Sequence, residues 1–536
     1  MKINKKFLFA FSAVALLSLA ACAGNGKEDK FLKEIANAPV ETNETILEEI
    51  SIRNADEDHG VYGNIYLPTN VDGAKITWWS SNESIIYPRA YDNVAPGEVT
   101  RTREDTVVNL KAKIEKNGVV TKFEQDVLVK ALDHQLDDDD FEAYLFGHFV
   151  GEGYGEGPQS MEGHPTGEQI FFALADVGEG LHFKDMNGST MNNLKPVLKS
   201  EVGELGVRDP YICRSPEGDS FYLIATDLSV YTRGGWNGGG GNANAATKTG
   251  SHSIIIWESH DLVNWTEGRQ IEVARKDAGM AWAPEMTFCE ETGEYMIFFS
   301  STLLDDVSKG ANANIIWRDC VYYTTTRDFI HFGETKRFIP GTDYQDSVTS
   351  RNESERNAEN NDQRKVIDGS VMKIGDYYYS ACKDGGNNED GGGIRIMRTE
   401  TLLPEEDDNG EEYIPWEFVQ NLADVGFQAA EGKNADNKCL EGPEWFYLNK
   451  ADRKDADVPE IGLMADFYAN TSVGYIPWAT TDVEDIGNVH NSWRKLESGT
   501  GAGKFSWDNQ TKRHGTILRI TAEEAERLKE AYPIAK

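Results

Sequence analysis

Residues 43–132 show a regular alternation of apolar and polar positions. Turn residues separate four such runs, which read GNIYLP, KITWWSSN, TVVNLKAKIEK and KFEQDVLVKAL. A period of two places neighbouring side chains on opposite faces of a strand, so each run is predicted to be a half-buried β-strand. Short strands with turns between them are typical of a small antiparallel β-sandwich.

The segment ITWWSSNESII in this region resembles bacterial immunoglobulin-like domains. The resemblance implies a separate sandwich domain over residues 43–132. Two interpretations of its adjacent tryptophans are open. Either Trp78 and Trp79 bind carbohydrate, or one of them packs the core and the domain is a spacer. Of these we favour the spacer.

The remainder of the chain repeats a set of apolar runs. Five similar segments start 75, 84, 74 and 73 residues apart, and they are VRDPYICRS from Val207, WAPEMTFCE from Trp282, VIDGSVMKI from Val366, LEGPEWFYL from Leu440 and RHGTILRIT from Arg513. A second apolar series of the same spacing begins at Tyr144, Phe221, Tyr295, Tyr377 and Ile461. A third, weaker series adds a strand, a polar turn and a closing aromatic residue to each unit. The pattern predicts five units of four strands, with the first series innermost.

Sheets of four strands repeated around an axis make a β-propeller. The first unit begins at Tyr144 without an inner strand of its own, and the last inner strand, from Arg513, has no outer strands after it. We therefore predict that the last strand completes the first blade by antiparallel pairing, which avoids an open sheet edge. The predicted fold is all-β: a five-bladed β-propeller over residues 140–536, preceded by the small immunoglobulin-like β-sandwich.

The inner strands of a propeller line its central channel, and their starts lie at one end of it. Five polar side chains near these starts are therefore expected to meet in one pit, and they are Asp209, Glu285, Asp368, Glu441 and His514. Turn chemistry would explain any one of them alone, because Asp and Glu beside Gly or Pro are common in turns. Five in corresponding repeats favour a functional cluster, and the long inserts between strands fall on the same face.

The motifs VRDPYI, YLIATD, WAPE, VIDGSV, EGP and RHGTIL resemble, in order and spacing, those of glycoside hydrolase family 43. The resemblance covers residues 140–536 and implies an inverting arabinofuranosidase, arabinanase or xylosidase. It implies that Asp209 is the general base, Glu441 the general acid, and Asp368 the carboxylate that tunes and orients the acid. One departure is VIDGSV, in which Gly369 follows the aspartate where proline is commoner.

The same resemblance bears on cofactors. His514 matches a histidine that in this family often lies near a metal ion or a water in the channel. No cofactor is expected to be required for the reaction. A structural calcium or other metal ion in the central channel, with His514 as a ligand, is the one such group that the resemblance implies.

Carboxyl groups facing one another across a pit suit glycoside hydrolysis with inversion. One must be protonated to release the leaving group, and the other must be ionised to activate water on the opposite side of the sugar. Asp209 and Glu441 belong to units two steps apart in a ring of five, which leaves room for that water. Asp368, in the unit next to that of Glu441, is expected to raise the pKa of Glu441 by like-charge repulsion. Three residues are assigned to substrate binding: Trp282, as a stacking wall or else a core residue, Glu285, as an orienting group, and Arg513.

The most specific prediction is an exo-acting α-L-arabinofuranosidase, because long loops on one face should build a pocket. A β-xylosidase or endo-arabinanase on the same scaffold stays open, as does a non-catalytic glycan-binding lipoprotein. A fructan-cleaving propeller would need an NDPNG-like aspartate one blade before RDP, where this chain has RHGTIL. A phosphorylase would need a basic phosphate pocket, and only Arg208 and Arg513 are expected near the pit.

Composition argues against one class of partner. The 536 residues carry 90 acidic and 53 basic side chains, a formal charge of −37, so a nucleic acid held through its phosphates is not expected. The acidic residues are spread along the chain, which is typical of a solvated surface. Five cysteines follow Cys22, an odd number without CxxC spacing, which predicts buried free thiols, with a single disulfide left open.

The first 22 residues have a basic start, an apolar run from Phe7 to Ala21, and small residues before Cys22. This pattern predicts a signal peptide, since the run is too short for a membrane span. LAAC resembles the bacterial lipobox, whose cysteine is lipidated. We therefore expect a cell-envelope lipoprotein, periplasmic or at the outer surface, that is anchored to the membrane through Cys22, with residues 23–42 as a polar tether.

Overall fold

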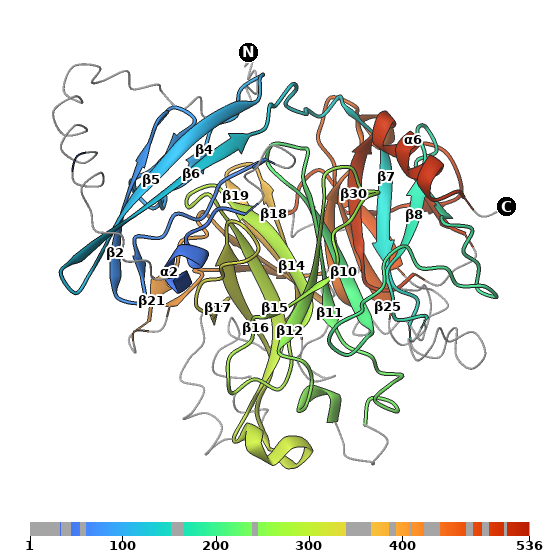
Figure 1. Ribbon diagram of the computed structural model, residues 1–536. Helices are drawn as coiled ribbons and strands as arrows, with labels where there is room; N and C mark the ends of the chain where they lie inside the picture. Colours follow the sequence, from blue (N-terminus) through green and yellow to red (C-terminus); the bar gives the residue numbers. More distant parts are fainter. Residues whose placement is uncertain are drawn as a thin grey trace, which may run out of the picture.

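The described part of the chain is nearly all β-structure, arranged in two domains in the computed structural model (Figure 1). It comprises residues 33, 44–53, 60–151, 166–237, 245–338, 366–384, 393–407, 410, 412–422, 440–467, 475–484, 493–508 and 512–534. The predicted signal peptide with Cys22, most of the tether and much of the predicted long inserts lie outside these residues. Within them, no helix has the length and apolar character needed to cross a membrane.

The first domain is built on a four-stranded sheet, whose strands in spatial order are β1 (Asn70–Val71), β2 (Ala74–Ser80), β5 (Thr106–Lys116) and β6 (Val119–Val129). Helix α2 (Glu44–Glu49) precedes it, and a second sheet pairs β3 (Ile86–Tyr87) with β4 (Glu98–Val99). Trp78 packs in the core of this domain, where its Nε1–H donates to the Pro68 carbonyl at 2.8 Å. This is the core position that the spacer interpretation assigned to one of the two tryptophans.

One predicted strand, GNIYLP, is not a strand. Residues 63–68 belong to no β-strand, and Gly63 lies in a bend. The Asn64 side chain donates to the Gly293 carbonyl of the second domain and accepts from the Val99 N–H, each at 2.9 Å. These contacts join the segment to the second domain and to β4 of its own domain, and an alternating pattern does not reveal them.

The second domain is the predicted five-bladed β-propeller, and we number its blades 1 to 5 from the sheet that contains β7. Its inner strands are β30 (Thr516–Thr521), β10 (Val207–Arg214), β14 (Trp282–Cys289), β18 (Val366–Ile374) and β24 (Leu440–Tyr447). The second strands are β7 (Phe141–His148), β11 (Phe221–Asp227), β15 (Glu294–Leu304), β19 (Tyr377–Asp384) and β25 (Ile461–Phe467). The third strands are β8 (Phe171–Ala175), β12 (Ser253–Ser259), β16 (Ile315–Thr326), β20 (Ile394–Thr399) and β26 (Tyr475–Thr480). The fourth strands are β9 (Leu181–Asp185), β13 (Arg269–Glu272), β17 (Lys336–Arg337), β23 (Glu417–Asn421) and β27 (Arg494–Lys495).

The ring of blades is closed in the way that the repeat predicts. Each inner strand contacts the inner strands of both neighbouring blades. Strand β30 pairs antiparallel with β7, with Thr516 opposite Gly147 and Ile520 opposite Ala143. In Figure 1 these strands, from opposite ends of the domain, lie side by side. The last inner strand therefore completes the first blade.

Two blades carry edge strands that the repeat did not predict. Strands β28 (Glu497–Ser498) and β29 (Lys504–Trp507) extend blade 1, and β21 (Glu405–Glu406) and β22 (Glu412–Tyr413) extend blade 3. Both extensions join by parallel pairing between distant parts of the chain. Helix α6 (Ala522–Ala531) follows β30 and begins with a capping box formed by Thr521 and Glu524.

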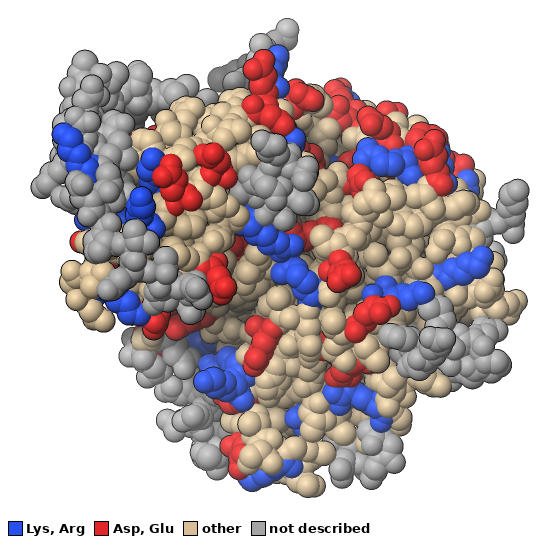
Figure 2. Space-filling model, in the orientation of Figure 1, with Lys and Arg blue, Asp and Glu red and all other residues tan. Residues whose placement is uncertain are grey.

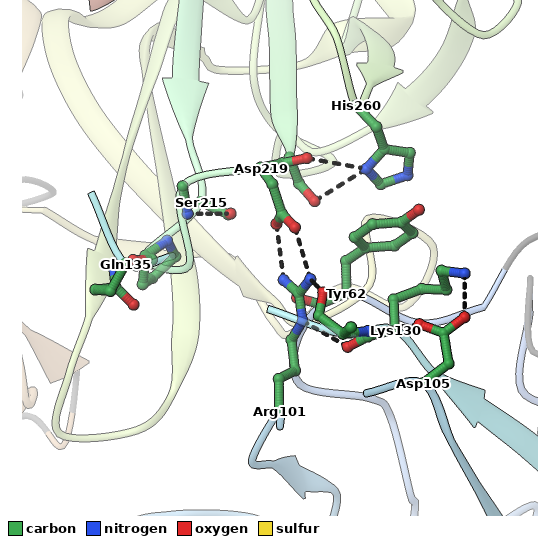
Figure 3. A network of polar contacts seen from close by, with 12 residues as sticks. Tyr62, Arg101, Asp105, Lys130, Gln135, Ser215, Asp219 and His260 are labelled. Carbon is green, nitrogen blue, oxygen red and sulfur yellow. Dashed lines mark hydrogen bonds and ion pairs between the residues drawn. The ribbon is translucent and has the colours of Figure 1, made fainter. Parts of the chain in front are cut away.

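The two domains are joined by stacked rings and by an ion pair whose guanidinium group is buried (Figure 3). The Tyr62 ring lies 3.8 Å from the His260 ring, with the Arg101 guanidinium 5.2 Å from its centroid. Arg101, whose side chain is 1% exposed, donates to both oxygens of Asp219 at 2.7 and 2.6 Å. A second stack pairs Tyr66 with a histidine of blade 3 at 4.0 Å. The joint is therefore built from specific polar and aromatic contacts.

These contacts fix which end of the propeller meets the first domain. Asp219 lies in the turn after β10, and His260 follows β12. The inner strand β10 begins at Val207 on the opposite side, so the turn at Asp219 lies at its far end. The immunoglobulin-like domain therefore contacts the end of the blades opposite the starts of the inner strands.

The surface and the cysteines agree with a solvated acidic protein that has free thiols. Acidic and basic side chains are interspersed over the face drawn in Figure 2. Cys213, Cys289, Cys320 and Cys382 are free, and all four are at least partly buried. Cys439 lies outside the described residues.

The joint gives a prediction about stability. Arg101→Met removes a buried guanidinium that also donates to the carbonyls of Lys130 and Ala131. We expect a loss of about 2–3 kcal/mol in the free energy of unfolding, less than the roughly 3–5 kcal/mol for breaking a fully buried pair, because Asp219 is 37% exposed to water. Arg89→Met is the matched control, since Arg89 pairs with Glu83 at an exposed site and should cost less than about 1 kcal/mol. If the two variants lose equal free energy of unfolding in urea denaturation, Arg101 does not stabilise the contact between the domains.

Candidate active site

The inner strands of blades 2 to 5 are all interrupted at the same point. The register against the second strand shifts between Arg208 and Tyr211 in β10, and equivalent shifts occur in β14, β18 and β24. The first extra residue of each bulge has a left-handed backbone, with φ of 48° at Asp209, 44° at Ala283, 52° at Asp368 and 53° at Gly442. This conformation costs an L-residue about 1–2 kcal/mol, and Gly and Asp tolerate it best. The bulge lifts Asp209 and Asp368 out of the regular strand alternation.

The bulge also corrects the predicted alignment of the repeats. Asp209 and Asp368 occupy the bulge position, but Glu441 stands one residue before it, at the position of Arg208. Glu285 stands two residues after it. The five predicted side chains therefore approach one region of the channel at different depths and not at one matching position.

In each of these blades the second strand presents a polar side chain opposite the residue before the bulge. These side chains are Thr226, Ser300, Lys383 and Asp466. The Thr226 hydroxyl donates to Asp209 Oδ2 at 2.9 Å and accepts from the Ala283 N–H of the next blade at 2.7 Å. Ser300 Oγ accepts from the Asp368 N–H, also in the next blade, at 2.8 Å. Each hydroxyl thus holds the bulge of the following blade.

In the last two blades of this series the same position is charged. Lys383 Nζ donates to Glu441 Oε2 of blade 5 at 2.7 Å. Asp466 Oδ2 accepts from Arg513 Nε, just before β30, at 2.8 Å. Sequence analysis missed Lys383 and Asp466. The signal was present, because both stand near the end of an apolar second strand, where Thr226 stands in blade 2.

The acidic side chains of the pit differ in access to solvent. The Asp209 side chain is 17% exposed and that of Glu441 is 23% exposed. Asp368, Glu285 and Glu444 are buried. Asp209 and Glu441, on non-adjacent blades, are therefore the pair of predicted catalytic carboxylates that a solute can reach.

His514 stands between the accessible and the buried carboxylates. Its Nδ1 lies 3.7 Å from Asp209 Oδ1, and its Nε2 lies 3.5 Å from Glu285 Oε1. Burial by itself lowers the pKa of a histidine, but Glu285, Asp209 and Asp368 outweigh it and raise the pKa of His514 to about 9. His514 is therefore a cation at neutral pH that binds acidic groups at two depths.

Asp368 is placed to act on the strand that carries Glu441. Its Oδ2 accepts from the Gly442 N–H at 3.2 Å. Burial raises the pKa of Asp368 above its ordinary value, with His514 opposing the shift and Glu441 adding to it. These are contacts that a carboxylate orienting the acid would make.

Glu441 has the opposite electrostatics from those predicted. Asp368 was expected to raise the pKa of Glu441. Burial does favour the neutral form, but Lys383, followed by Arg513 and His514, outweighs it and lowers the pKa of Glu441. The prediction considered only the neighbouring carboxylate, because the sequence does not show which cation packs against it.

A second carboxyl pair, Glu285 and Glu444, lies deeper in the channel. Both are buried, and three of their oxygens have no hydrogen-bond donor among the described residues. These oxygens are Glu285 Oε1, Glu285 Oε2 and Glu444 Oε2. Burial raises the pKa of Glu285, and burial together with Glu285 raises that of Glu444. Burial therefore favours the neutral form of both carboxyl groups. Sequence analysis missed Glu444, although Pro443–Glu444 repeats the Pro284–Glu285 motif.

The remaining predicted residues are also in this region. The partly buried Trp282 ring packs edge-on against Trp236, with ring centroids 5.7 Å apart. Trp236 is 43% exposed, and its ring lies 5.0 Å from the guanidinium of Arg208, the residue before Asp209. Arg513 lies 3.7 Å from Glu441 Oε1. An aromatic corner thus stands beside the bulge of blade 2.

The geometry does not single out a metal site. In the described residues, no group of three or more His, Cys, Asp and Glu side chains is arranged to hold a metal ion. Both ring nitrogens of His514 face carboxylates at ion-pair distances. A metal ligand needs a free lone pair on one of them, so these contacts do not suit His514 to that role.

Comparison with known families agrees with this geometry. Residues 139–526 match a family described as a probable glycosyl hydrolase domain, related to glycoside hydrolase family 43. The chain belongs to this glycosyl hydrolase family. Residues 40–132 match the atrophied bacterial Ig domain family, which agrees with the immunoglobulin-like sandwich.

Individual relatives share the glycosyl hydrolase character. An α-L-arabinofuranosidase of Bifidobacterium longum is 29% identical over 483 residues, which are 83% of this chain but 37% of that protein. An α-L-arabinofuranosidase structure from Lactobacillus brevis is 15% identical over 58% of this chain and 76% of its own, with a TM-score of 0.32. The α-L-arabinofuranosidase PaAbf62A of Podospora anserina, in complex with cellotriose, is 11% identical over 61% and 82%, with a TM-score of 0.35.

The bulge gives a prediction about this glycosyl hydrolase. A Cβ added at Gly442 would lie 2.6 Å from His514 Cγ, and φ there is 53°. Gly442→Ala should therefore displace His514 and lower kcat/KM on an aryl glycoside by roughly 10- to 100-fold. Gly375→Ala is the control, because Gly375 has φ 63° with no atom within 4 Å of the added Cβ, so it should cost about 1 kcal/mol and leave kcat/KM unchanged. Equal kinetic effects of the two variants would contradict this role of Gly442.

Proposed function

We propose that the protein is an inverting, exo-acting α-L-arabinofuranosidase that acts on pentose-containing plant oligosaccharide or polysaccharide. The observation that carries the proposal is the pit in which Asp209 and Glu441 are open to solvent, while Asp368 and Glu285 are buried. A substrate can reach the first two carboxylates only. The buried ones act through His514 and the strand of Gly442.

In the proposed step, Asp209 accepts a proton from a water molecule while the water oxygen attacks the anomeric carbon. The bond from that carbon to the glycosidic oxygen breaks, and the leaving oxygen takes the proton of Glu441. Asp209 ends protonated and Glu441 ends ionised, so the charges balance. The Thr226 hydroxyl, 2.9 Å from Asp209 Oδ2, orients the base. The aromatic corner of Trp236 and Trp282 suits stacking on a sugar face.

The choice of pentose rests on the relative from Bifidobacterium longum, which is an α-L-arabinofuranosidase. This chain spans 37% of that protein, so its substrate is carried over as part of the proposal. Aryl α-L-arabinofuranosides, aryl β-xylosides and linear arabinan, offered separately, test it. Turnover of the arabinofuranosides supports the proposal, preferred turnover of xylosides points to a β-xylosidase, and binding without turnover of any points to a glycan-binding protein.

We also propose that the enzyme is a cell-envelope lipoprotein. The support is the pattern of residues 1–22, with a basic start, an apolar run and LAAC ending at Cys22. Metabolic labelling with a fatty acid tests it. Label that persists in a Cys22→Ser variant would overturn the anchor at Cys22.

The first prediction here is stereochemical. At about 5 Å Asp209 could attack the sugar directly with retention, whereas a separation of roughly 6.5–9.5 Å between the carboxyl groups admits water and inverts the configuration. Asp209 and Glu441 stand on β10 and β24, two inner strands that are not neighbours in the ring. We therefore expect the first-formed sugar to have inverted configuration in proton NMR. Initial release of the retained anomer would refute the pairing of these two carboxylates.

The second prediction separates the acid from the base. Glu441→Gln should lose activity on natural oligosaccharides but keep much more on substrates with very acidic leaving groups, which depart without a proton. Asp209→Asn should be inactive on both, since the water still lacks its base. The measurement is kcat/KM on a leaving-group series for each variant. A loss in Glu441→Gln that does not depend on the leaving group would assign Glu441 another role.

A further inference from the structure

Lys383 is a cation directly on the accessible carboxylate of blade 5. Its Nζ lies 2.7 Å from Glu441 Oε2, and the two side chains are 19% and 23% exposed. Lys383 comes from β19 of blade 4, so the contact crosses from one blade to the next. The Lys383–Glu441 pair lies at the mouth of the pit, where Arg513 Nη2 is 3.7 Å from Glu441 Oε1.

The fold does not require a cation at this position. In blades 2 and 3 the equivalent residues are Thr226 and Ser300, whose hydroxyls hold the next bulge through short hydrogen bonds. In blade 5 the Gly442 N–H is held by Asp368 Oδ2 at 3.2 Å, so Lys383 is not needed to hold this bulge. The ammonium group instead binds the side chain of Glu441. The position of Lys383 is therefore explained better by an effect on the chemistry of Glu441 than by the packing of the strands.

We propose that Lys383 is a positioning residue that sets the acid strength of Glu441 and thereby the upper pH limit of the enzyme. The inference rests on the proposed function, in which Glu441 is the general acid. A cation beside a carboxyl group favours proton release, so the acid donates more readily but keeps its proton over a narrower pH range. The arrangement after proton transfer, a carboxylate facing an ammonium group, is the one that this contact stabilises.

The other charged groups around Glu441 include some that favour its ionised form and some that favour its protonated form. Arg513 and His514 also favour the ionised form. Asp368 and Asp466 favour the protonated form, because each is a neighbouring acidic group. Lys383 is the strongest of the favourable charges and the one in direct hydrogen-bond contact. Its removal leaves only Arg513 and His514 to oppose burial and the two aspartates.

The test is the pH dependence of kcat/KM in Lys383→Met. Activity needs protonated Glu441, so kcat/KM falls as pH rises through the pKa of this acid. Because Lys383 lowers that pKa, its loss should move the alkaline limb upward by about 1–3 pH units. Lys383→Arg keeps the charge and should leave the limb close to its wild-type position. Lys373→Met, which removes an exposed lysine 2.5 Å from Glu290, should not move it.

Two controls keep the outcome interpretable. If the alkaline fall in kcat/KM reflects ionisation of Glu441, it should be absent from Glu441→Gln on a substrate with a very acidic leaving group. The protonation of Glu441 can also be followed without turnover, by infrared difference spectra of the carboxyl group during pH titration, with Glu441→Gln identifying its band. This measurement decides the role of Lys383 even if no arabinofuranoside is hydrolysed, an outcome that would instead refute the proposed function.

The results divide cleanly. An upward shift of the limb or of the Glu441 titration in Lys383→Met, restored in Lys383→Arg, supports the proposal. An unchanged titration in a folded Lys383→Met variant overturns it. A loss of rate with an unmoved limb would also overturn it, because it would mean that Lys383 acts only on the structure of the pit.

Discussion

The site depends on one backbone constraint, the left-handed residue at the bulge of each inner strand. Regular strand alternation would point Asp209 and Asp368 to one face of a blade, whereas a φ near 50° redirects each toward the channel. This backbone is costly, so neighbouring groups must hold it in place. The hydroxyls of Thr226 and Ser300, which accept hydrogen bonds from backbone N–H groups of the next blade, supply that hold. The catalytic geometry is thus a product of how the blades pack on one another.

Depth in the channel then sorts the acidic groups by charge state. Glu285 and Glu444 lie where burial favours the neutral form. Near the mouth, Lys383 and Arg513 surround Glu441 with positive charge. His514 connects the two levels as a buried cation. Acidic groups within one pit therefore experience opposite electrostatic environments, with burial favouring the neutral form in the deeper groups and cations favouring the ionised form of Glu441.

The immunoglobulin-like domain is joined to the same propeller at its other end. The Arg101–Asp219 pair and the Tyr62–His260 stack make this contact specific. Trp78 is used in the core of its own domain, with its indole N–H bonded to Pro68. These observations favour a spacer that holds the propeller by the end away from the pit.

Sequence alone determined the number of blades, their order and the closure of the ring, because each strand buries its own apolar residues and the spacing repeats. It also indicated Asp209, Asp368, Glu441 and His514, since each stands at the start of an inner strand. Tertiary structure decided the bulge register, which places Glu441 and Glu285 on either side of the position that Asp209 occupies. It also decided that GNIYLP leaves the sheet and that Lys383 reverses the expected pKa shift of Glu441. Periodicity reports burial within one strand, whereas these features depend on side chains that only the packing of separate blades and domains brings into contact.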